Sequence, residues 1–155
     1  MVSIDLKRVD DAFAMEATDS NGHTVRMDTG ASNGGNNSGA SPMQLLLMAL
    51  GGCSAIDVID ILKKQRQTIS DYKMKVNAER EKDKTPALWE TAEIEFYIYG
   101  NVEPQKAKRA VELSMDKYCS VAATLLKSGT KLSWKTFVND QPIKEDNYDA
   151  LAGEI

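Results

Sequence analysis

The sequence predicts an α+β fold, and three observations lead to that prediction. Short segments in which polar and apolar residues alternate, as they do in half-buried strands, gather near the N-terminus and at the centre of the chain. Longer apolar segments at residues 42–67 and 104–128 repeat with helical spacing. The order of elements, with three strands before the first helix and a pair of strands after it, predicts that regular βαβ units do not form.

The first 41 residues are expected to contain a small sheet and a loop. Residues 1–28 predict a three-stranded meander, with turn signals at Asp10-Asp11 and at residues 20–22. Residues 29–41 are rich in Gly, Asn and Ser, so a flexible, exposed loop is expected there. Ser41 followed by Pro42 marks a helix start, since Ser serves as N-cap and Pro suits the first helical position.

The central helix predicted at residues 42–67 is apolar around nearly its whole circumference as far as Ile56, which predicts that protein surrounds it. It is also long enough to cross a membrane. Asp57 and Asp60 argue against that location, because each would cost about 2.5–3.5 kcal/mol at a membrane centre. The sequence therefore predicts the core helix of a soluble protein that has no membrane partner.

The second half of the chain is expected to contain strands around a second helical region. Residues 70–102 predict two long strands in a hairpin, and Pro104 begins the helices of residues 104–128. Residues 130–138 predict a final strand, and residues 139–155 an acidic tail with little to hold it. All these segments are expected to form one domain spanning residues 1–155, because 155 residues of which 42% are hydrophobic suffice for one core.

Composition limits the classes of function. The first residues carry scattered charges and lack the apolar run of a secretory signal, so a cytoplasmic protein is expected. The net charge of −4, with basic residues dispersed among acidic ones, argues against a nucleic-acid partner. One His and two Cys that lie far apart in the chain do not form the usual ligand set of a structural zinc site. We therefore predict neither a metal nor a cofactor.

The two cysteines, Cys53 and Cys119, raise the question of reactivity. Free Cys is often an inert, buried packing residue, and Asp57, one turn after Cys53, would oppose a thiolate unless a cation intervened. Gly51-Gly52 is costly inside a helix, which suggests close approach of another backbone or room for a substrate beside the sulfur. A serine follows each cysteine and could donate to a thiolate, although serine is too common to decide.

Two motifs together carry a family resemblance. "SPMQLLLMALGGCSAIDVIDIL" around Cys53 and "KYCSVAATL" around Cys119 resemble the OsmC/Ohr family of peroxide-stress proteins and, more narrowly, its YhfA-like branch. The likeness extends to about residue 138. It implies an intertwined homodimer in which strands of both subunits wrap around the central helices, with active sites near the interface.

The resemblance also implies a reaction. Cys53 would attack an organic hydroperoxide and become a sulfenic acid, and Cys119 would condense with it to a disulfide within bridging distance. A dithiol such as a lipoyl protein would reduce that disulfide. Apolar residues on the central helix, namely Leu46, Leu47, Leu50 and Ile56, would suit an alkyl or fatty-acyl peroxide.

One departure from the family pattern concerns activation of the nucleophile. Peroxidase members carry a Glu that holds an Arg against the sulfur, and Met43 stands in its place here. Arg26 is the nearest upstream arginine, although an exposed strand charge is its simpler interpretation. Asp57 could instead partner an arginine of the other subunit, such as Arg80. Without such a cation the thiol pKa would stay near ~8.5.

Three interpretations follow from the sequence. The first is a thiol-dependent peroxidase that uses Cys53 and Cys119, with activity weakened by Met43. The second is a non-catalytic protein of the same fold that binds a small hydrophobic ligand at the dimer interface. The third is a structural or interaction protein whose cysteines only pack.

Overall fold

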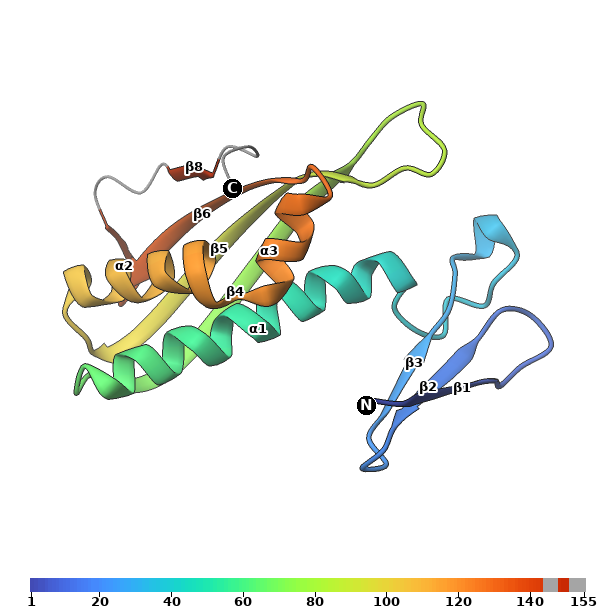
Figure 1. Ribbon diagram of the computed structural model, residues 1–155, viewed down its shortest axis with the longest axis horizontal. Helices are drawn as coiled ribbons and strands as arrows, with labels where there is room; N and C mark the ends of the chain where they lie inside the picture. Colours follow the sequence, from blue (N-terminus) through green and yellow to red (C-terminus); the bar gives the residue numbers. More distant parts are fainter. Residues whose placement is uncertain (144–147, 151–155) are drawn as a thin grey trace. The chain divides into compact units, whose positions relative to one another are not determined.

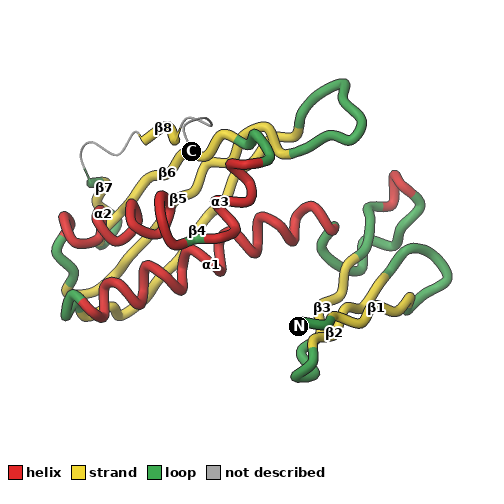
Figure 2. The backbone as a smooth tube through the Cα atoms, in the orientation of Figure 1, coloured by secondary structure: helices red, strands yellow, loops and turns green. Residues whose placement is uncertain are grey.

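The computed structural model describes residues 1–143 and 148–150 and combines helices with two sheets (Figures 1 and 2). The α+β class is therefore confirmed. The chain divides into two compact units, Met1–Met48 and Ala49–Ile155, and each is described by itself.

The first unit contains the predicted meander. Its antiparallel strands follow the order β1-β2-β3 and are β1 (Ile4–Arg8), β2 (Met15–Asp19) and β3 (Thr24–Met27). The carboxylate of Asp19 shapes the second turn by accepting hydrogen bonds from the backbone N–H groups of Asn21 and His23, both at 2.9 Å. Gly22 occupies the left-handed region in that turn, with φ of 88°.

The Gly/Asn loop of residues 29–41 is exposed over most of its length, as predicted, but hydrogen bonds hold its backbone in place. The buried carboxylate of Asp28 accepts hydrogen bonds from the backbone N–H groups of Thr29, Asn36 and Ser38 and from the Ser38 hydroxyl. Gly35 lies so close to Thr29 that an added Cβ would come within 2.2 Å of the Thr29 carbonyl oxygen. The expectation of a flexible loop overlooked this acidic anchor.

Helix α1 (Pro42–Lys64) begins where the sequence predicts and ends three residues earlier than predicted. A capping box closes its start: Ser41 Oγ accepts from the Gln44 N–H at 3.3 Å, and Gln44 Oε1 accepts from the Ser41 N–H at 2.9 Å. The helix ends because Arg66 adopts the left-handed conformation, with φ of 58°, and Gln67 N–H turns back to the Leu62 carbonyl.

The second unit contains a larger sheet, whose path runs β4-β5-β6-β7. Its strands are β4 (Thr68–Arg80), β5 (Trp89–Asn101), β6 (Lys131–Val138), β7 (Gln141–Pro142) and β8 (Tyr148–Ala150), the last of which also pairs with β6. Strands β4 and β5 form the predicted antiparallel hairpin. Strand β6 runs parallel to β5.

The parallel pair of β5 and β6 forms one βαβ unit, which the expectation that regular βαβ units do not form left out. Parallel neighbours need a long crossover, and the whole helical region supplies it. That region comprises α2 (Pro104–Leu113), a π-helical turn, η2 (Ser114–Tyr118), and α3 (Ser120–Lys127). The element order alone did not reveal that the last strand returns beside β5.

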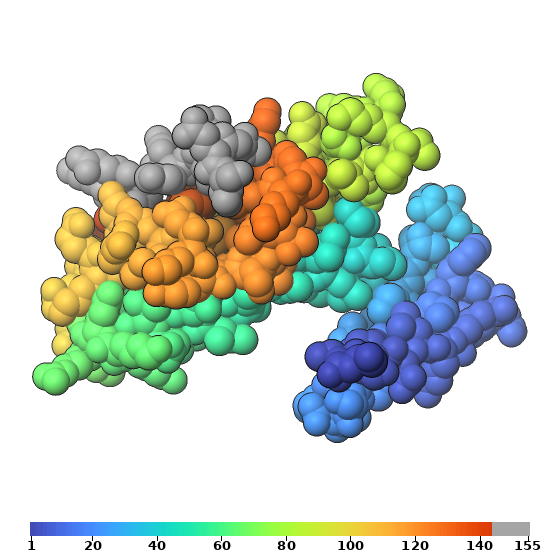
Figure 3. All heavy atoms as spheres, in the orientation of Figure 1, coloured from blue at the N-terminus to red at the C-terminus, as the bar shows by residue number. Residues whose placement is uncertain are grey.

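Helices and sheet of the second unit share one core. On α1 the buried residues repeat every fourth position, and they are Leu50, Ser54, Val58 and Leu62. On β5 every second residue faces inward, from Ala92 through Phe96 to Ile98. In the space-filling view the atoms of the crossover helices lie directly against those of α1 (Figure 3), and Ser114 of η2 donates a hydrogen bond to Asp57 of α1.

The described residues of the second unit leave part of α1 exposed. Ile56 is 71% exposed, so the prediction that protein surrounds the whole helix is wrong for a single chain. Of the described helices, α1 alone is long and apolar enough to cross a membrane, with a mean hydropathy of 2.0 over its best window. Its buried face nevertheless packs within the protein, and Asp57 lies among other polar groups.

The C-terminal segment is held more firmly than predicted where it is described. Strand β7 pairs with Phe137 and Val138, and β8 pairs with residues 132–134 of β6. The rest of the predicted acidic tail, residues 144–147 and 151–155, lies outside the described residues.

Candidate active site

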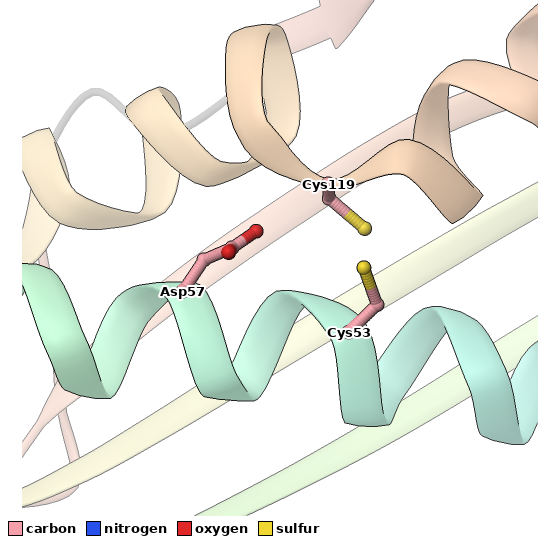
Figure 4. Close-up of side chains that lie close together, drawn as sticks. All are labelled: Cys53, Asp57 and Cys119. Atoms are coloured by element: carbon pink, nitrogen blue, oxygen red, sulfur yellow. The ribbon is translucent and has the colours of Figure 1, made fainter.

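Three side chains of the second unit meet between α1 and the junction of η2 with α3. The Sγ atoms of Cys53 and Cys119 and a carboxylate oxygen of Asp57 all lie within 4.8 Å of one another. Figure 4 shows the two sulfurs pointing toward each other, with Asp57 beside them. Both cysteines are free thiols. The fold thus brings together Cys53, Cys119 and Asp57, all of which were singled out from the sequence.

Local backbone geometry places each sulfur. Cys53 and Asp57 are four residues apart on α1, so both side chains project from one face of the helix. The π-helical turn closes with a 2.8 Å hydrogen bond from the Cys119 N–H to the Ser114 carbonyl. Cys119 then adopts an extended conformation as N-cap of α3, and its Sγ accepts from the Ala122 N–H at 3.4 Å.

The start of α3 makes Cys53 more acidic. Burial raises the pKa of the Cys53 thiol, but hydrogen bonds from the Val121 N–H, the Cys119 thiol and the Ser120 hydroxyl outweigh it, so the pKa lies below its ordinary value. The charge of Asp57 acts in the opposite direction, as expected from the sequence. Backbone N–H groups at a helix N-terminus are a recognised means of stabilising a thiolate.

Cys119 has the opposite character. Its side chain is only 3% exposed, and burial raises the pKa of its thiol to about 12. The Ala122 N–H lowers that pKa somewhat, whereas the neighbouring Cys53 sulfur raises it further. At neutral pH Cys119 is therefore a protonated thiol beside a more acidic one.

Asp57 is held by Ser114, a residue that sequence reasoning missed. The Ser114 hydroxyl donates to Asp57 Oδ2 at 3.1 Å and lies 3.4 Å from the Ser54 carbonyl oxygen. Ser114 is fully buried, which fixes the carboxylate beside the sulfurs. A serine in a helix carries no sequence signal for such a role, since the contact joins residues 57 positions apart.

The two serines that follow the cysteines behave differently. Ser120 follows Cys119 in the chain, but its Oγ contacts the sulfur of Cys53, at 4.0 Å. Ser54 Oγ instead donates to the Leu50 carbonyl at 2.8 Å within α1.

The glycine pair before Cys53 has open space beside it. A Cβ on Gly51 would meet Val76 at an ordinary 3.9 Å, and one on Gly52 would meet nothing within 4 Å. Close approach by any of the described residues therefore does not explain the glycine pair.

Both candidate arginines have local partners. Arg26 lies on β3 in the first unit, where its Nε donates to Ser38 Oγ at 3.2 Å. Arg80 donates to the Ala87 carbonyl and lies over the Trp89 ring, 5.6 Å from its centroid. A role for either arginine beside Cys53 stays a prediction.

Comparison with known proteins identifies the family. The family model described as OsmC-like protein matches residues 35–135, a span that contains both cysteines. The chain belongs to the OsmC-like family.

Relatives support this membership at two levels. The chain is 43% identical to Protein YhfA of Escherichia coli K12 over 108 residues, which are 69% of this chain and 77% of that protein. A hypothetical protein of Aquifex aeolicus VF5 is 34% identical, with a TM-score of 0.74 over 90% of this chain and 98% of that one. The resemblance to the OsmC/Ohr family and its YhfA-like branch is thus confirmed.

A more distant OsmC-like structure shows the shared fold. The organic hydroperoxide resistance protein of Elizabethkingia anophelis is 14% identical, with a TM-score of 0.68 over 90% of this chain and 96% of that one. Because α1 is long and apolar enough to cross a membrane, the expected absence of a membrane partner stays a prediction.

Proposed function

We propose that this OsmC-like protein is a thiol-dependent peroxidase that reduces organic hydroperoxides through Cys53 and Cys119. The observation that carries the proposal is the unequal thiol pair: two free sulfurs from separate elements lie within 4.8 Å, and only Cys53 has a lowered pKa. A thiolate is the form that attacks peroxides, and a nearby second thiol limits over-oxidation. Names of related hydroperoxide resistance proteins agree with this reaction class.

The first step assigns attack to Cys53. Its thiolate attacks one oxygen of the hydroperoxide, the O–O bond breaks, and the alkoxide leaves and takes a proton to become an alcohol. Cys53 is left as a sulfenic acid. The Val121 N–H and the Ser120 hydroxyl stabilise the attacking anion, so the start of α3 takes over part of the role of the Glu that Met43 replaces.

The second step assigns resolution to Cys119. Its sulfur attacks the Cys53 sulfenic acid, a disulfide forms, and the hydroxyl leaves as water with the thiol proton. The two sulfurs must move closer, because a disulfide bond is about 2.05 Å long. We assign to Asp57, whose carboxylate oxygen lies within 4.8 Å of both sulfurs, the transfer of the Cys119 proton to the leaving hydroxyl.

We assign reduction of the disulfide to an external dithiol such as a lipoyl protein, whose two thiols are oxidised as both cysteines return to thiols. We place the cycle in the cytoplasm, where free thiols persist. We further propose a homodimer, because apolar residues of the strands and of α1 are exposed in the single chain, among them Ile4, Leu6 and Ile56.

Mass spectrometry after one equivalent of an organic hydroperoxide tests the proposal. The parent protein should lose two hydrogens per chain as a Cys53–Cys119 disulfide forms, whereas Cys119→Ser should gain one oxygen on Cys53. Both samples should be treated with a chelator beforehand so that bound metal does not mask the thiols.

If both thiols stay reduced under excess hydroperoxide, the peroxidase proposal is wrong. In that case a co-purified apolar molecule would favour the non-catalytic binding protein expected as the alternative. A disulfide between subunits, instead of within one chain, would contradict the pairing of Cys53 with Cys119 described above.

A further inference from the structure

The reduced site also has the composition of a cation site. We propose that the reduced protein binds one thiophilic divalent cation of the zinc class through the Sγ atoms of Cys53 and Cys119 and a carboxylate oxygen of Asp57. Sequence spacing argued against a metal because the two cysteines are far apart in the chain. The fold removes that objection by placing all three donor atoms within 4.8 Å of one another.

The charge of the cluster favours a cation. Once an ion has displaced both thiol protons, two thiolates and a carboxylate lie side by side, and these like charges are unfavourable without the bound positive charge. Asp57 accepts a hydrogen bond from the neutral Ser114 hydroxyl, which adds no positive charge to the cluster. A divalent cation would supply the charge that the protein does not.

Donor type and spacing match a zinc-class ion. Thiolate sulfur prefers soft or borderline cations, with Zn–S distances of about 2.3 Å, which puts two thiolates on a tetrahedral ion about 3.8 Å apart. Two ligands four residues apart on one helix, as in Cys53 and Asp57, are a recurring way for helices to hold zinc. Modest side-chain rotations would close the remaining gaps.

The surroundings support ligation as well. Ser114 donates to Asp57 at 3.1 Å and the Ala122 N–H donates to Cys119 Sγ at 3.4 Å, so two of the three ligands are already oriented by outer hydrogen bonds. Three protein ligands leave a fourth position for water or a small molecule. Cys53 is only partly buried, so an ion can enter from that side.

Metal binding does not depend on the proposed peroxidase cycle, but it would compete with it. Each cysteine gives up its thiol proton to solvent when it binds the ion. A Cys53–Cys119 disulfide has no thiolate left, so oxidation by a hydroperoxide would release the cation.

Titration of the reduced, full-length protein with Co²⁺, followed by Zn²⁺, tests the inference. We expect one Co²⁺ per chain with an intense thiolate-to-metal charge-transfer band, and complete displacement by Zn²⁺. Cys53→Ser and Cys119→Ser should each lose the band. Asp57→Asn should weaken binding at least as much as loss of an outer-shell partner does, about 10–100-fold.

Asp60→Asn is the matched control. Asp60 lies on the same helix, but its side chain is 56% exposed and pairs with Lys64 at 2.6 Å, so its replacement should leave binding unchanged. The absence of a charge-transfer band, equal affinity of Asp57→Asn and the parent, or equal weakening by Asp60→Asn would each overturn the inference. Should a cysteine variant fail to fold, reversible blocking of both thiols in the native protein must abolish the band.

The two proposals can fail separately. A disulfide that forms in chelator-treated protein without any Co²⁺ binding to the reduced protein contradicts only the cation site. One Co²⁺ per chain in a protein whose thiols resist hydroperoxide contradicts only the peroxidase.

Discussion

The regions around Cys53 and Cys119 begin from nearly the same local sequence, a cysteine followed by a serine in a helical segment, and end with opposite chemistry. Cys53 lies within an uninterrupted helix, partly buried, and its thiol pKa is lowered. Cys119 lies where a π-helical turn gives way to α3, almost fully buried, and its thiol pKa is raised to about 12.

The difference shows that helix position, and not the dipeptide, sets thiol character. The break before α3 directs the first backbone N–H groups of that helix at both sulfurs. The greater burial of Cys119 then makes the pKa values of the two thiols differ. Interruptions such as π-helical turns often occur at functional sites. This difference in pKa predicts that Cys53 is the attacking thiol and Cys119 the resolving one.

The largest expected effect comes from removing one sulfur or the other. Cys53→Ser should reduce hydroperoxide consumption to the rate of a protein-free blank, because the attacking atom is gone. Cys119→Ser should still consume about one equivalent per chain before it stops. A peroxide-consumption assay separates the two, and equal losses in both variants would erase the proposed difference between the cysteines.

The pH dependence of alkylation tests the difference in pKa between the two thiols, with an expected tenfold change in rate per pH unit for Cys53. In metal-free protein, Cys53 should react with iodoacetamide about tenfold faster per pH unit until the pH passes its lowered pKa, because only the thiolate reacts. Cys119 should stay unmodified throughout the neutral range. Quantitative peptide mapping measures both rates, and faster alkylation of Cys119 would reverse the assignment.

The loss of stability at alkaline pH reports on Cys119 through the difference between the parent and Cys119→Ser, since tyrosines such as Tyr72 also have a raised pKa. Above the ordinary thiol pKa the unfolded chain loses a proton that the folded chain keeps until its pKa of about 12, so the free energy of unfolding should fall as pH rises. The slope is at most about 1.4 kcal/mol per pH unit. Cys119→Ser keeps an N-cap oxygen and does not titrate there, so urea unfolding should show a shallower loss for that variant.

The smallest expected effect concerns the hydroxyl beside Cys53. Ser120→Ala removes a weak, 4.0 Å contact and should raise the Cys53 pKa and slow alkylation at neutral pH about threefold, in line with a hydrogen bond of about 0.5–1 kcal/mol. Ser54→Ala is the matched control, because its hydroxyl bonds to the Leu50 carbonyl. Similar rates for the two variants would show that Ser120 does not act on Cys53.

Much of the fold could be predicted from sequence because it depends on local signals. Alternation predicted the meander and the hairpin, and Ser41-Pro42 predicted the start of α1 together with its cap. The anchored loop could not be predicted in the same way, since Asp28 holds residues up to 10 positions away. The crossover between β5 and β6 was also missed, because strand pairing is a long-range choice.

The sequence by itself singled out Cys53 and Cys119 as candidate site residues, because two specific motifs carry the likeness to OsmC-like proteins. Only the tertiary structure decided how the thiols differ and what lies beside them. Ser114, Ser120 and the Val121 N–H reach the site from another helical segment, and a pKa responds to neighbours in space rather than in the chain. Asp57 likewise became a possible metal ligand only when folding brought both sulfurs to it.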